Sequence, residues 1–228
     1  MPDPQPQLTL YTYFRSSAAT RVRTVLALHG VDYDSVPIHL LKGEQRAPEY
    51  LAHNPSGAVP ALAVRDASGA WDLTQSAAII EYVDEVFGPS SARGSLLPAD
   101  ARGRALVRSI VDILVCDMQP LANLKVLTKV KAIAGDEAAM PWAREWCEAG
   151  MGALEAILAK TAGEYAYGDG LTLADVALAP QMHSCIRFGV KLEDYPTAHR
   201  VFTRVSALPE FVSADWRHQP DTPDEFKA

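Results

Sequence analysis

The stretch Leu8–Gly30, LTLYTYFRSSAATRVRTVLALHG, runs from a short alternating strand into an amphipathic helix. The helix is predicted by apolar residues that recur at helical spacing, with a histidine one turn further on: Val22, Val25, Leu26 and His29. Gly30 is typical of the left-handed residue that ends a helix. Ser16 or Ser17 is therefore the predicted N-cap of this helix.

The start of this helix is a favourable place for an anion. Its first N–H groups have no partner within the helix, and the helix dipole is positive there. A thiolate, a carboxylate or a phosphate beside Ser16 or Ser17 would be stabilised without a metal. The alternative is that the serines only cap the helix, as serines at helix starts commonly do.

A second feature is the segment Asn54–Pro60, NPSGAVP, which leads from a turn into a strand predicted over residues 61–64. A proline that opens a strand is a candidate for a cis peptide bond, and it leaves the backbone groups of Val59 facing outward. An extended peptide could then pair with Val59. The alternative is a plain turn without a binding role.

A third feature is Thr74-Gln75-Ser76, between a short strand at residues 71–73 and a helix with an apolar face. Ser76 is predicted to be a second N-cap, able to receive a carboxylate. A capped helix is commonplace, so this feature alone also fits a structural role. Three such features in one half of the chain favour a binding site.

The order of elements up to residue 87 is that of a small α/β unit. It reads strand, helix, strand (residues 33–40), short helix, two strands joined through residues 66–69, and helix. The first helix implies a parallel crossover, and the hairpin adds an antiparallel pair. We therefore expect a thioredoxin-like domain with a mixed sheet over residues 1–88, followed by a Gly- and Pro-containing linker over residues 89–98.

Residues 99–228 are helical in period and predict an all-α domain. Pro120 must end or kink its helix, because it lacks an N–H and clashes with the preceding turn. We expect this kink to aim Gln119 and Asn123 into a cleft. The segment Leu171–Asp175 reads as a capping box, and the polar residues 219–228 are expected to be loosely ordered.

The composition is that of a soluble globular protein. Of 228 residues, 48% are hydrophobic, and the net charge of -7 argues against a nucleic-acid-binding surface. No apolar stretch is long enough to span a membrane and residues 1–7 lack a signal-peptide pattern, so we expect a cytoplasmic protein. The histidines show no ligand spacing, and no metal site is predicted. The three cysteines are widely spaced and are expected to be reduced core thiols: Cys116, Cys147 and Cys185.

Several short motifs together carry a family resemblance that extends from about residue 8 to residue 223. They are Arg15-Ser16-Ser17, Arg21-Val22-Arg23, Asn54-Pro55, Val59-Pro60, Gln75-Ser76 with the residues up to Tyr82, Gln119-Pro120-Leu121 with Asn123, and Arg187-Phe188. The chain resembles the glutathione transferases, and specifically the zeta class that contains the maleylacetoacetate and maleylpyruvate isomerases. Val59-Pro60 and Gln75-Ser76 are general to these transferases, whereas the Ser-Ser, Arg-Val-Arg and Gln-Pro-Leu patterns are more specific to the zeta class.

The resemblance implies a glutathione transferase fold, with an α/β thioredoxin-like N-terminal domain that binds glutathione and an all-α C-terminal domain that binds substrate. It also implies a homodimer with glutathione as cofactor. Ser16, with Ser17, would stabilise the thiolate of glutathione, and Gln75 and Ser76 would bind its γ-glutamyl carboxylate. Val59 would pair with its cysteinyl unit. The remaining positions matched to glutathione binding are Lys42, Gln45, Pro60, Gln119 and Asn123.

Arg15 and Arg187 match positions at which two guanidinium groups grip a substrate that has two carboxylates. The alternative is that they form surface or interdomain ion pairs. Arg21 and Arg23 are expected to be structural residues at a subunit interface and not to take part in the chemistry. Lys125 stands where one bacterial branch has arginine, which leaves the choice between maleylacetoacetate and maleylpyruvate open.

The function implied by the resemblance is a glutathione-dependent cis-trans isomerase acting on maleylacetoacetate or maleylpyruvate, in the catabolism of tyrosine or other aromatic compounds. One alternative is a zeta-class transferase acting on α-halo acids, and another is a non-catalytic interaction module with the same fold. Ala18 stands where many zeta members carry a cysteine. Because reductive dehalogenation needs a protein thiol there to resolve a mixed disulfide, Ala18 argues against that activity.

Overall fold

The computed structural model describes residues 5–227, which divide into two compact units. The first comprises residues 5–94 together with 209–227, and the second comprises residues 95–208. Residues 209–227, which the sequence assigns to the helical half, thus group with the first unit. Among the described residues, no helix combines the length and apolar character needed to cross a membrane.

The first unit is built on a four-stranded sheet in the order β2-β1-β3-β4. Its strands are β1 (Gln7–Thr12), β2 (Asp34–Pro37), β3 (Ala61–Asp66) and β4 (Gly69–Thr74). β1 pairs in parallel with β2 and antiparallel with β3, and β3 pairs antiparallel with β4. The predicted mixed sheet, with its parallel crossover and its hairpin, is therefore confirmed.

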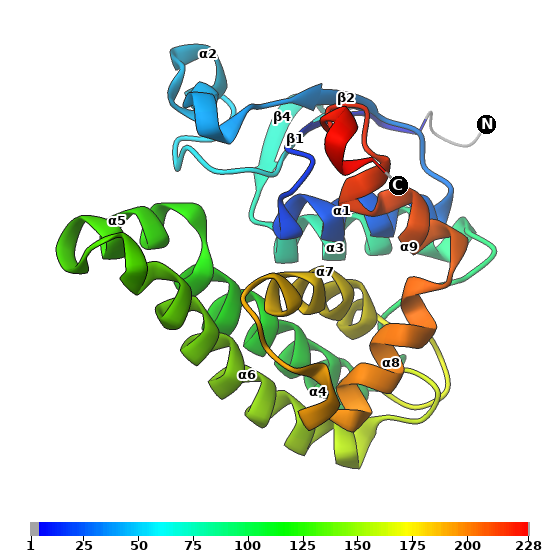
Figure 1. Ribbon diagram of the computed structural model, residues 1–228. Helices are drawn as coiled ribbons and strands as arrows, with labels where there is room; N and C mark the ends of the chain where they lie inside the picture. Colours follow the sequence, from blue (N-terminus) through cyan, green and yellow to red (C-terminus); the bar gives the residue numbers. More distant parts are fainter. Residues whose placement is uncertain (1–4, 228) are drawn as a thin grey trace. The chain divides into compact units, whose positions relative to one another are not determined.

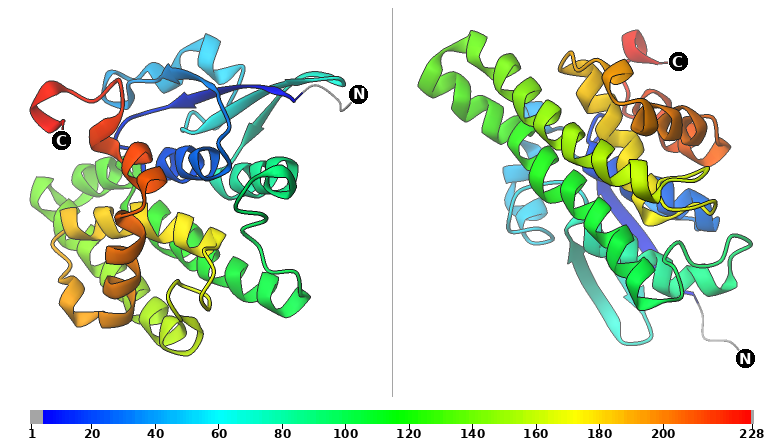
Figure 2. Two further views of the ribbon diagram at one scale, coloured as in Figure 1. Left: turned by 90° about the vertical axis from the view of Figure 1, so that its right-hand side faces the viewer. Right: turned by 90° about the horizontal axis from the view of Figure 1, so that it is seen from below.

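Helices cover both faces of this sheet. The helices of the first unit are α1 (Ser17–His29), α2 (Pro48–Leu51), α3 (Ser76–Phe87) and α9 (Pro209–Ala214). α1 and α3 lie side by side on one face, as Figure 1 shows, and α9 packs against α1. The left view of Figure 2 shows α2 on the opposite side of the sheet.

α1 begins and ends where the sequence predicts. Ser16 is its N-cap, and Gly30 follows its last residue with φ of 64°, in the left-handed region. The apolar stripe Val22, Val25 and Leu26 is fully buried. At the end of the helix, His29 Nε2 lies 3.1 Å from Asp84 Oδ1 and His29 Nδ1 lies 2.9 Å from Ser91 Oγ, so α1 is fastened to α3.

β2 is shorter than the predicted strand over residues 33–40. It ends at Pro37, which pairs with Thr12, and the Ile38 N–H makes one more bond to the Thr12 carbonyl at 2.7 Å. The chain then turns into two short 3-10 helices, Leu40–Lys42 and Glu44–Arg46. The expectation of a strand to residue 40 was thus wrong, because the chain leaves the sheet at His39, which is the N-cap of the first 3-10 helix.

The second unit is helical, as predicted. Its helices are α4 (Ala101–Asp112), α5 (Leu124–Ala134), α6 (Ala139–Thr161), α7 (Leu173–Arg187) and α8 (Pro196–Ser206). α7 packs against α4, α6 and α8, and the right view of Figure 2 shows it beside α8. Every residue from Leu173 to Met182 is buried, so α7 is the centre of this unit.

The predicted capping box begins α7. The Thr172 side chain accepts the N–H of Asp175, and the Asp175 carboxylate accepts the Thr172 N–H at 2.8 Å and the Thr172 hydroxyl at 3.0 Å. Asp175 also accepts the N–H of Ala166 at 2.8 Å. The carboxylate therefore ties the preceding loop to the helix start.

Pro120 coincides with the end of a long helical segment. α4 passes at residue 113 into a π-helix (Ile113–Met118), and the chain continues as a 3-10 helix over Gln119–Ala122. The predicted break at this proline is confirmed. Cys147 and Cys185 are buried as expected, but Cys116 lies on the outer side of the π-helix and is exposed, so it is not a core thiol.

Candidate functional site

Ser16 is placed at the start of α1 by the turn that leaves β1. Its backbone is extended (φ −78°, ψ 114°), and its Oγ accepts the N–H of Ala19 at 3.2 Å. The hydroxyl therefore acts as the N-cap and keeps its own proton for donation to a ligand. Ser17 is the first residue of the helix, and the side chain of Arg15 is exposed to solvent. The three residues meet at the positive end of the α1 dipole.

Val59 lies just ahead of β3, and its bond to Pro60 is cis, as the sequence had suggested. The β1–β3 ladder begins only at Ala61, so the backbone of Val59 lies outside it. The side chain of Val59 packs against the cluster of Ile38, Tyr50 and Ala61. The turn before it is fixed by Asn54, whose Nδ2 donates to the Ala58 carbonyl at 2.6 Å.

Ser76 is not an N-cap, and the prediction of that role was wrong by one residue. α3 begins at Ser76, and its N-cap is Gln75, which has φ of 72° and makes no capping hydrogen bond through its side chain. Gln75 is the one non-glycine residue with positive φ in the described chain. Such a backbone conformation is held by surrounding structure and is often found at ligand sites.

Arg21 joins the two helix starts. It lies in the second turn of α1, its side chain is 1% exposed, and its Nη1 donates to Ser76 Oγ at 3.1 Å. The start of α3 therefore carries a buried guanidinium in addition to its own N–H groups. Together they make this place strongly favourable for a carboxylate.

Lys42 and Gln45 occupy the two 3-10 helices that follow β2. Lys42 is exposed, whereas Gln45 is 8% exposed. Its Oε1 is buried and has no hydrogen-bond partner among the described residues. A buried amide oxygen without a partner is costly, so Gln45 is suited to accept a hydrogen bond from a ligand.

The remaining predicted site residues belong to the second unit. Gln119 begins the 3-10 helix after the π-helix, and Asn123 is the N-cap of α5, with its Oδ1 accepting the Val126 N–H at 3.0 Å. Arg187 is the last residue of α7, where a cation is favoured by the helix dipole. Its Cζ lies 4.7 Å from the centroid of the Phe188 ring.

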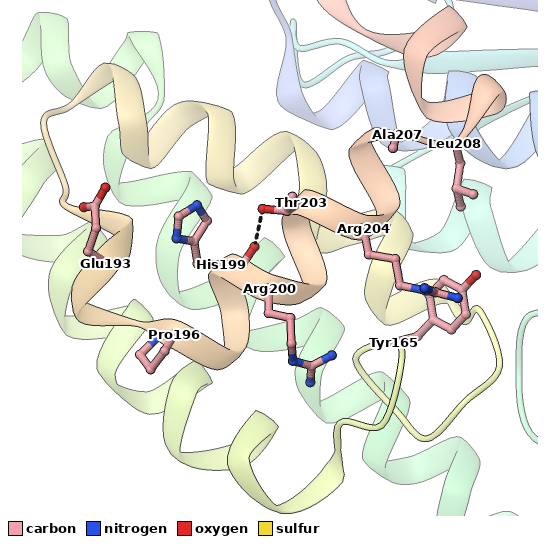
Figure 3. Close-up of a pocket in the computed structure, with 9 residues that line it drawn as sticks. All are labelled: Tyr165, Glu193, Pro196, His199, Arg200, Thr203, Arg204, Ala207 and Leu208. Atoms are coloured by element: carbon pink, nitrogen blue, oxygen red, sulfur yellow. Dashed lines mark hydrogen bonds between the residues drawn. The ribbon is translucent and has the colours of Figure 1, made fainter.

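A shallow hollow of about 830 Å³ lies along α8, and it contains none of these residues. Figure 3 shows His199, Arg200 and Arg204 on its α8 side. Arg204 is already engaged, because it lies 4.9 Å from the centroid of the Tyr165 ring and pairs with Glu164. No group of three or more His, Cys, Asp or Glu side chains within residues 5–227 is arranged to hold a metal ion.

Comparison with known families settles what kind of fold this is. Residues 6–85 match the model of the glutathione S-transferase N-terminal domain, and residues 117–213 match that of the glutathione S-transferase C-terminal domain. The chain belongs to the glutathione S-transferase family. The expected fold class, a thioredoxin-like α/β domain with an all-α domain, is thereby confirmed.

The similar proteins place this transferase in the zeta class. It is 46% identical over 224 residues to the maleylacetoacetate isomerase of Aspergillus fumigatus, covering 97% of this chain and 96% of that one. A crystal structure of maleylacetoacetate isomerase from Anaeromyxobacter dehalogenans, with dicarboxyethyl glutathione and citrate bound, is 37% identical with a TM-score of 0.85, and 96% of each chain is covered.

A third relative is the holo structure of a bacterial zeta-class maleyl pyruvate isomerase. It is 39% identical to this chain with a TM-score of 0.86, and the match covers 94% of this chain and 100% of that one. All three relatives are isomerases by name. The resemblance drawn from the sequence motifs is thus confirmed.

Sequence reasoning missed the position of two arginines in this zeta-class transferase. Arg21 and Arg23 were expected to be structural residues at a subunit interface; their burial within the first unit, at 1% and 2% exposed, was not predicted. The signal was present, because Arg-Val-Arg stands in a helix whose neighbouring positions are apolar. A buried charge in such a place must have specific partners.

Proposed function

We propose that this chain is a glutathione-dependent cis-trans isomerase that acts on maleylacetoacetate or maleylpyruvate in the catabolism of tyrosine or other aromatic compounds. The observation that carries the proposal is the capping hydroxyl of Ser16, which stands at the start of α1 with a proton left to donate. The names of the three relatives support the reaction class. Bound dicarboxyethyl glutathione in one of them supports an acidic substrate.

The first unit has the groups needed to hold glutathione. Ser76 and the N–H groups at the start of α3, backed by Arg21, would bind the γ-glutamyl carboxylate. The backbone of Val59 would pair with the cysteinyl unit, next to Pro60. The fit is supported by Gln45, whose buried Oε1 needs a donor. Lys42 and the second-unit residues Gln119 and Asn123 complete the proposed set.

Ser16 would keep the sulfur of glutathione ionised. A thiol with a pKa of about 8.5 is only a few per cent ionised at neutral pH, and each unit of lowering requires about 1.4 kcal/mol. A hydrogen bond to the anion contributes roughly 1.5–3 kcal/mol, and the helix dipole about 0.3–1 kcal/mol. These contributions suffice for one to two units, with Ser17 as a further hydroxyl beside the cap.

The chemistry supplied by bound glutathione is a thiolate that adds reversibly to the cis double bond and leaves again after rotation about the resulting single bond. The residues of this chain would orient the substrate during that rotation. We assign its two carboxylates to Arg15 in the first unit and Arg187 in the second. The guanidinium groups would also stabilise the enolate that forms when the carbon–sulfur bond is made.

The experiment that tests the function is a spectroscopic assay of purified protein with maleylacetoacetate and with maleylpyruvate, each with and without glutathione. We expect isomerisation of at least one substrate that depends on glutathione. Retention on immobilised glutathione without turnover of either substrate would contradict the isomerase assignment. Failure to be retained at all would favour a non-catalytic module with this fold.

A second candidate activity is displacement of halide from α-halo acids, which would use the same thiolate and the same carboxylate grip. Ala18 limits which reactions on halo acids are open to this chain, because no cysteine thiol follows the two serines. Simple displacement needs no protein thiol, whereas reductive dehalogenation does. Assays of the products formed from a halo acid would therefore separate simple displacement from reductive dehalogenation.

Replacement of Arg187 tests the carboxylate grip. We expect Arg187→Ala to raise KM for the diacid roughly 10- to 100-fold, since a charge-assisted hydrogen bond contributes about 1.5–3 kcal/mol. KM for glutathione should stay near the wild-type value. Steady-state kinetics with both substrates measures the effect.

Arg204→Ala is the matched control for Arg187, because Arg204 is an exposed arginine of the same unit that pairs with Glu164 on the surface. We expect this variant to behave as wild type. An equal loss in the Arg187 variant with an uncharged thiol acceptor would contradict a role for Arg187 in carboxylate binding.

We further propose that the protein is a cytoplasmic homodimer with the first unit as the glutathione-binding part and the second as the substrate-binding part. The dimer and the roles of the two units derive from the zeta-class resemblance. Sedimentation of the purified protein tests the dimer.

A further inference from the structure

The turn that carries Ser16 is short and mostly buried. Tyr13 and Phe14 are 7% and 4% exposed, and the Ser16 N–H donates to the Tyr13 carbonyl at 3.0 Å. The orientation of the Phe14 peptide groups therefore fixes where Ser16 stands at the start of α1.

The N–H of Phe14 is held by a residue 207 positions further along the chain. It donates to Asp221 Oδ2 at 2.8 Å. Figure 1 shows the end of the described chain, in red, folded back to the blue residues of β1 and α1 in the same unit. The expectation that residues 219–228 are loosely ordered is therefore wrong for residues 219–222, whereas residues 224–227 are exposed and residue 228 lies outside the described residues.

The carbonyl of Phe14 is held from the other side by Arg23. Its Nη2 donates to the Phe14 oxygen at 3.1 Å and its Nη1 to Thr12 Oγ1 at 2.9 Å. Its Nε donates to the carbonyl of Ala214, the last residue of α9, at 3.1 Å. One buried guanidinium thus connects the Ser16 turn, the end of β1 and the end of α9.

Arg23 keeps its charge in this position. Burial lowers the pKa of Arg23 to about 10, while the charges of Tyr33, Asp221 and Asp215 act to raise it. The guanidinium is accordingly protonated at neutral pH. Asp221 therefore acts on the turn twice, through its hydrogen bond to Phe14 and through its field at Arg23.

Asp221 is presented by a built turn. Gln219 Nε2 donates to the carbonyls of Ser213 at 2.9 Å and Asp215 at 2.8 Å, and the Thr222 N–H donates to the Gln219 carbonyl at 3.1 Å. Gln219 and Thr222 are buried on either side of Asp221. The carboxylate is thus held in place independently of the turn that it contacts.

We propose that Asp221, together with Arg23, is a positioning residue that sets the Ser16 hydroxyl for the thiolate of bound glutathione. The proposal rests on the glutathione-dependent function proposed above. Asp221 and Arg23 hold both peptide groups of Phe14, and loss of either hold lets the turn shift the Ser16 hydroxyl away from the sulfur. The Ser16 hydroxyl can then no longer accept the Ala19 N–H and at the same time donate to the thiolate of glutathione in its best geometry.

The test compares Asp221→Ala with Asp221→Asn, whose amide oxygen can still accept the Phe14 N–H. The readouts are the pKa of the bound glutathione thiol, followed by the ultraviolet absorbance of the thiolate, and kcat and KM for the isomerisation. We expect Asp221→Ala to raise the thiol pKa by about 0.5–1 unit, which is about three- to tenfold in thiolate at neutral pH. kcat should fall by the same factor with KM for the diacid unchanged, and Asp221→Asn should restore most of both.

Asp224→Ala is the matched control, because Asp224 lies on the same segment but is exposed and bonds only Lys227 among the contacts described. We expect it to match wild type. An unchanged thiol pKa in Asp221→Ala would overturn the proposal, even with a lower kcat, and so would an Asn variant as impaired as the Ala variant. Circular dichroism and thermal unfolding check that each variant folds.

Failure of the proposed function gives a different result. Wild-type protein would then bind glutathione without isomerising either diacid, and the thiol titration of the Asp221 variants would still report on positioning.

Discussion

Replacement of Ser16 by alanine is expected to lower kcat of the isomerisation about 10- to 100-fold at neutral pH, because the thiolate loses a hydrogen bond of about 1.5–3 kcal/mol. The pKa of the bound thiol should rise by roughly one to two units. Activity should then recover toward high pH, where the thiol ionises unaided. The pH profile of kcat and the ultraviolet titration of bound glutathione measure both effects.

Two controls separate this role from helix capping. Ser16→Thr keeps a hydroxyl that can cap and donate, and we expect it to retain most activity. Asp100→Ala removes an equivalent cap from α4, where Asp100 accepts the Gly103 N–H at 2.9 Å. It should cost about 1 kcal/mol of stability and leave kcat unchanged. Wild-type turnover in Ser16→Ala would remove Ser16 from the mechanism.

Replacement of Asp175 by alanine is expected to give the largest loss of stability. It removes three hydrogen bonds and leaves the N–H groups of Ala166 and Thr172 buried without an acceptor. Each such group costs about 1–3 kcal/mol, so we expect the free energy of unfolding to fall by about 3–5 kcal/mol. Denaturant unfolding measures it. Asp169→Ala, which removes one bond to the Glu164 N–H from an exposed carboxylate, should cost less than about 1 kcal/mol.

The same carboxylate predicts a pH dependence. Burial raises the pKa of Asp175 from 3.8 to about 6, against the lowering effect of its hydrogen bonds to Ala166 and Thr172. Between these pH values the folded chain holds a proton on Asp175 that the unfolded chain has lost. The stabilising contribution of Asp175 to the free energy of unfolding is therefore fully present below about pH 4 and is lost as pH rises through about 6. We expect the free energy of unfolding to fall over this range in wild type. In Asp175→Asn the free energy of unfolding should lack the part of this decline that Asp175 causes. The same slope with pH in the variant and in wild type would contradict the prediction.

Local signals in the sequence were sufficient for much of the fold. Ser16 and Gly30 act on the backbone within one turn of α1, so residue type and spacing identify both ends of that helix. The capping box at Thr172 and Asp175 and the break at Pro120 are equally local. The parallel pairing of the first two strands and the antiparallel hairpin followed from the lengths of the connections, whereas the order of the strands in the sheet was not predicted.

The errors arose where distant residues decide the conformation. Ser76 looks like a cap, but Gln75 takes a positive φ that no local preference favours, and Ser76 enters the helix with its hydroxyl on Arg21. Arg23 is buried because its partners include a carbonyl 191 positions away. Asp221 lies in a polar segment that gives no sign of a partner at Phe14. The roles of the site residues in binding and chemistry stay predictions.

The return of residues 209–227 to the first unit has a consequence for synthesis on the ribosome. Domains usually complete in the order in which they are translated. Here the second unit is one continuous stretch, whereas Phe14 and Arg23 must wait for partners that lie 207 and 191 codons later. The nascent chain would thus finish its helical part before the turn at Ser16 takes its final form, and a fragment that stops at residue 94 would never acquire it.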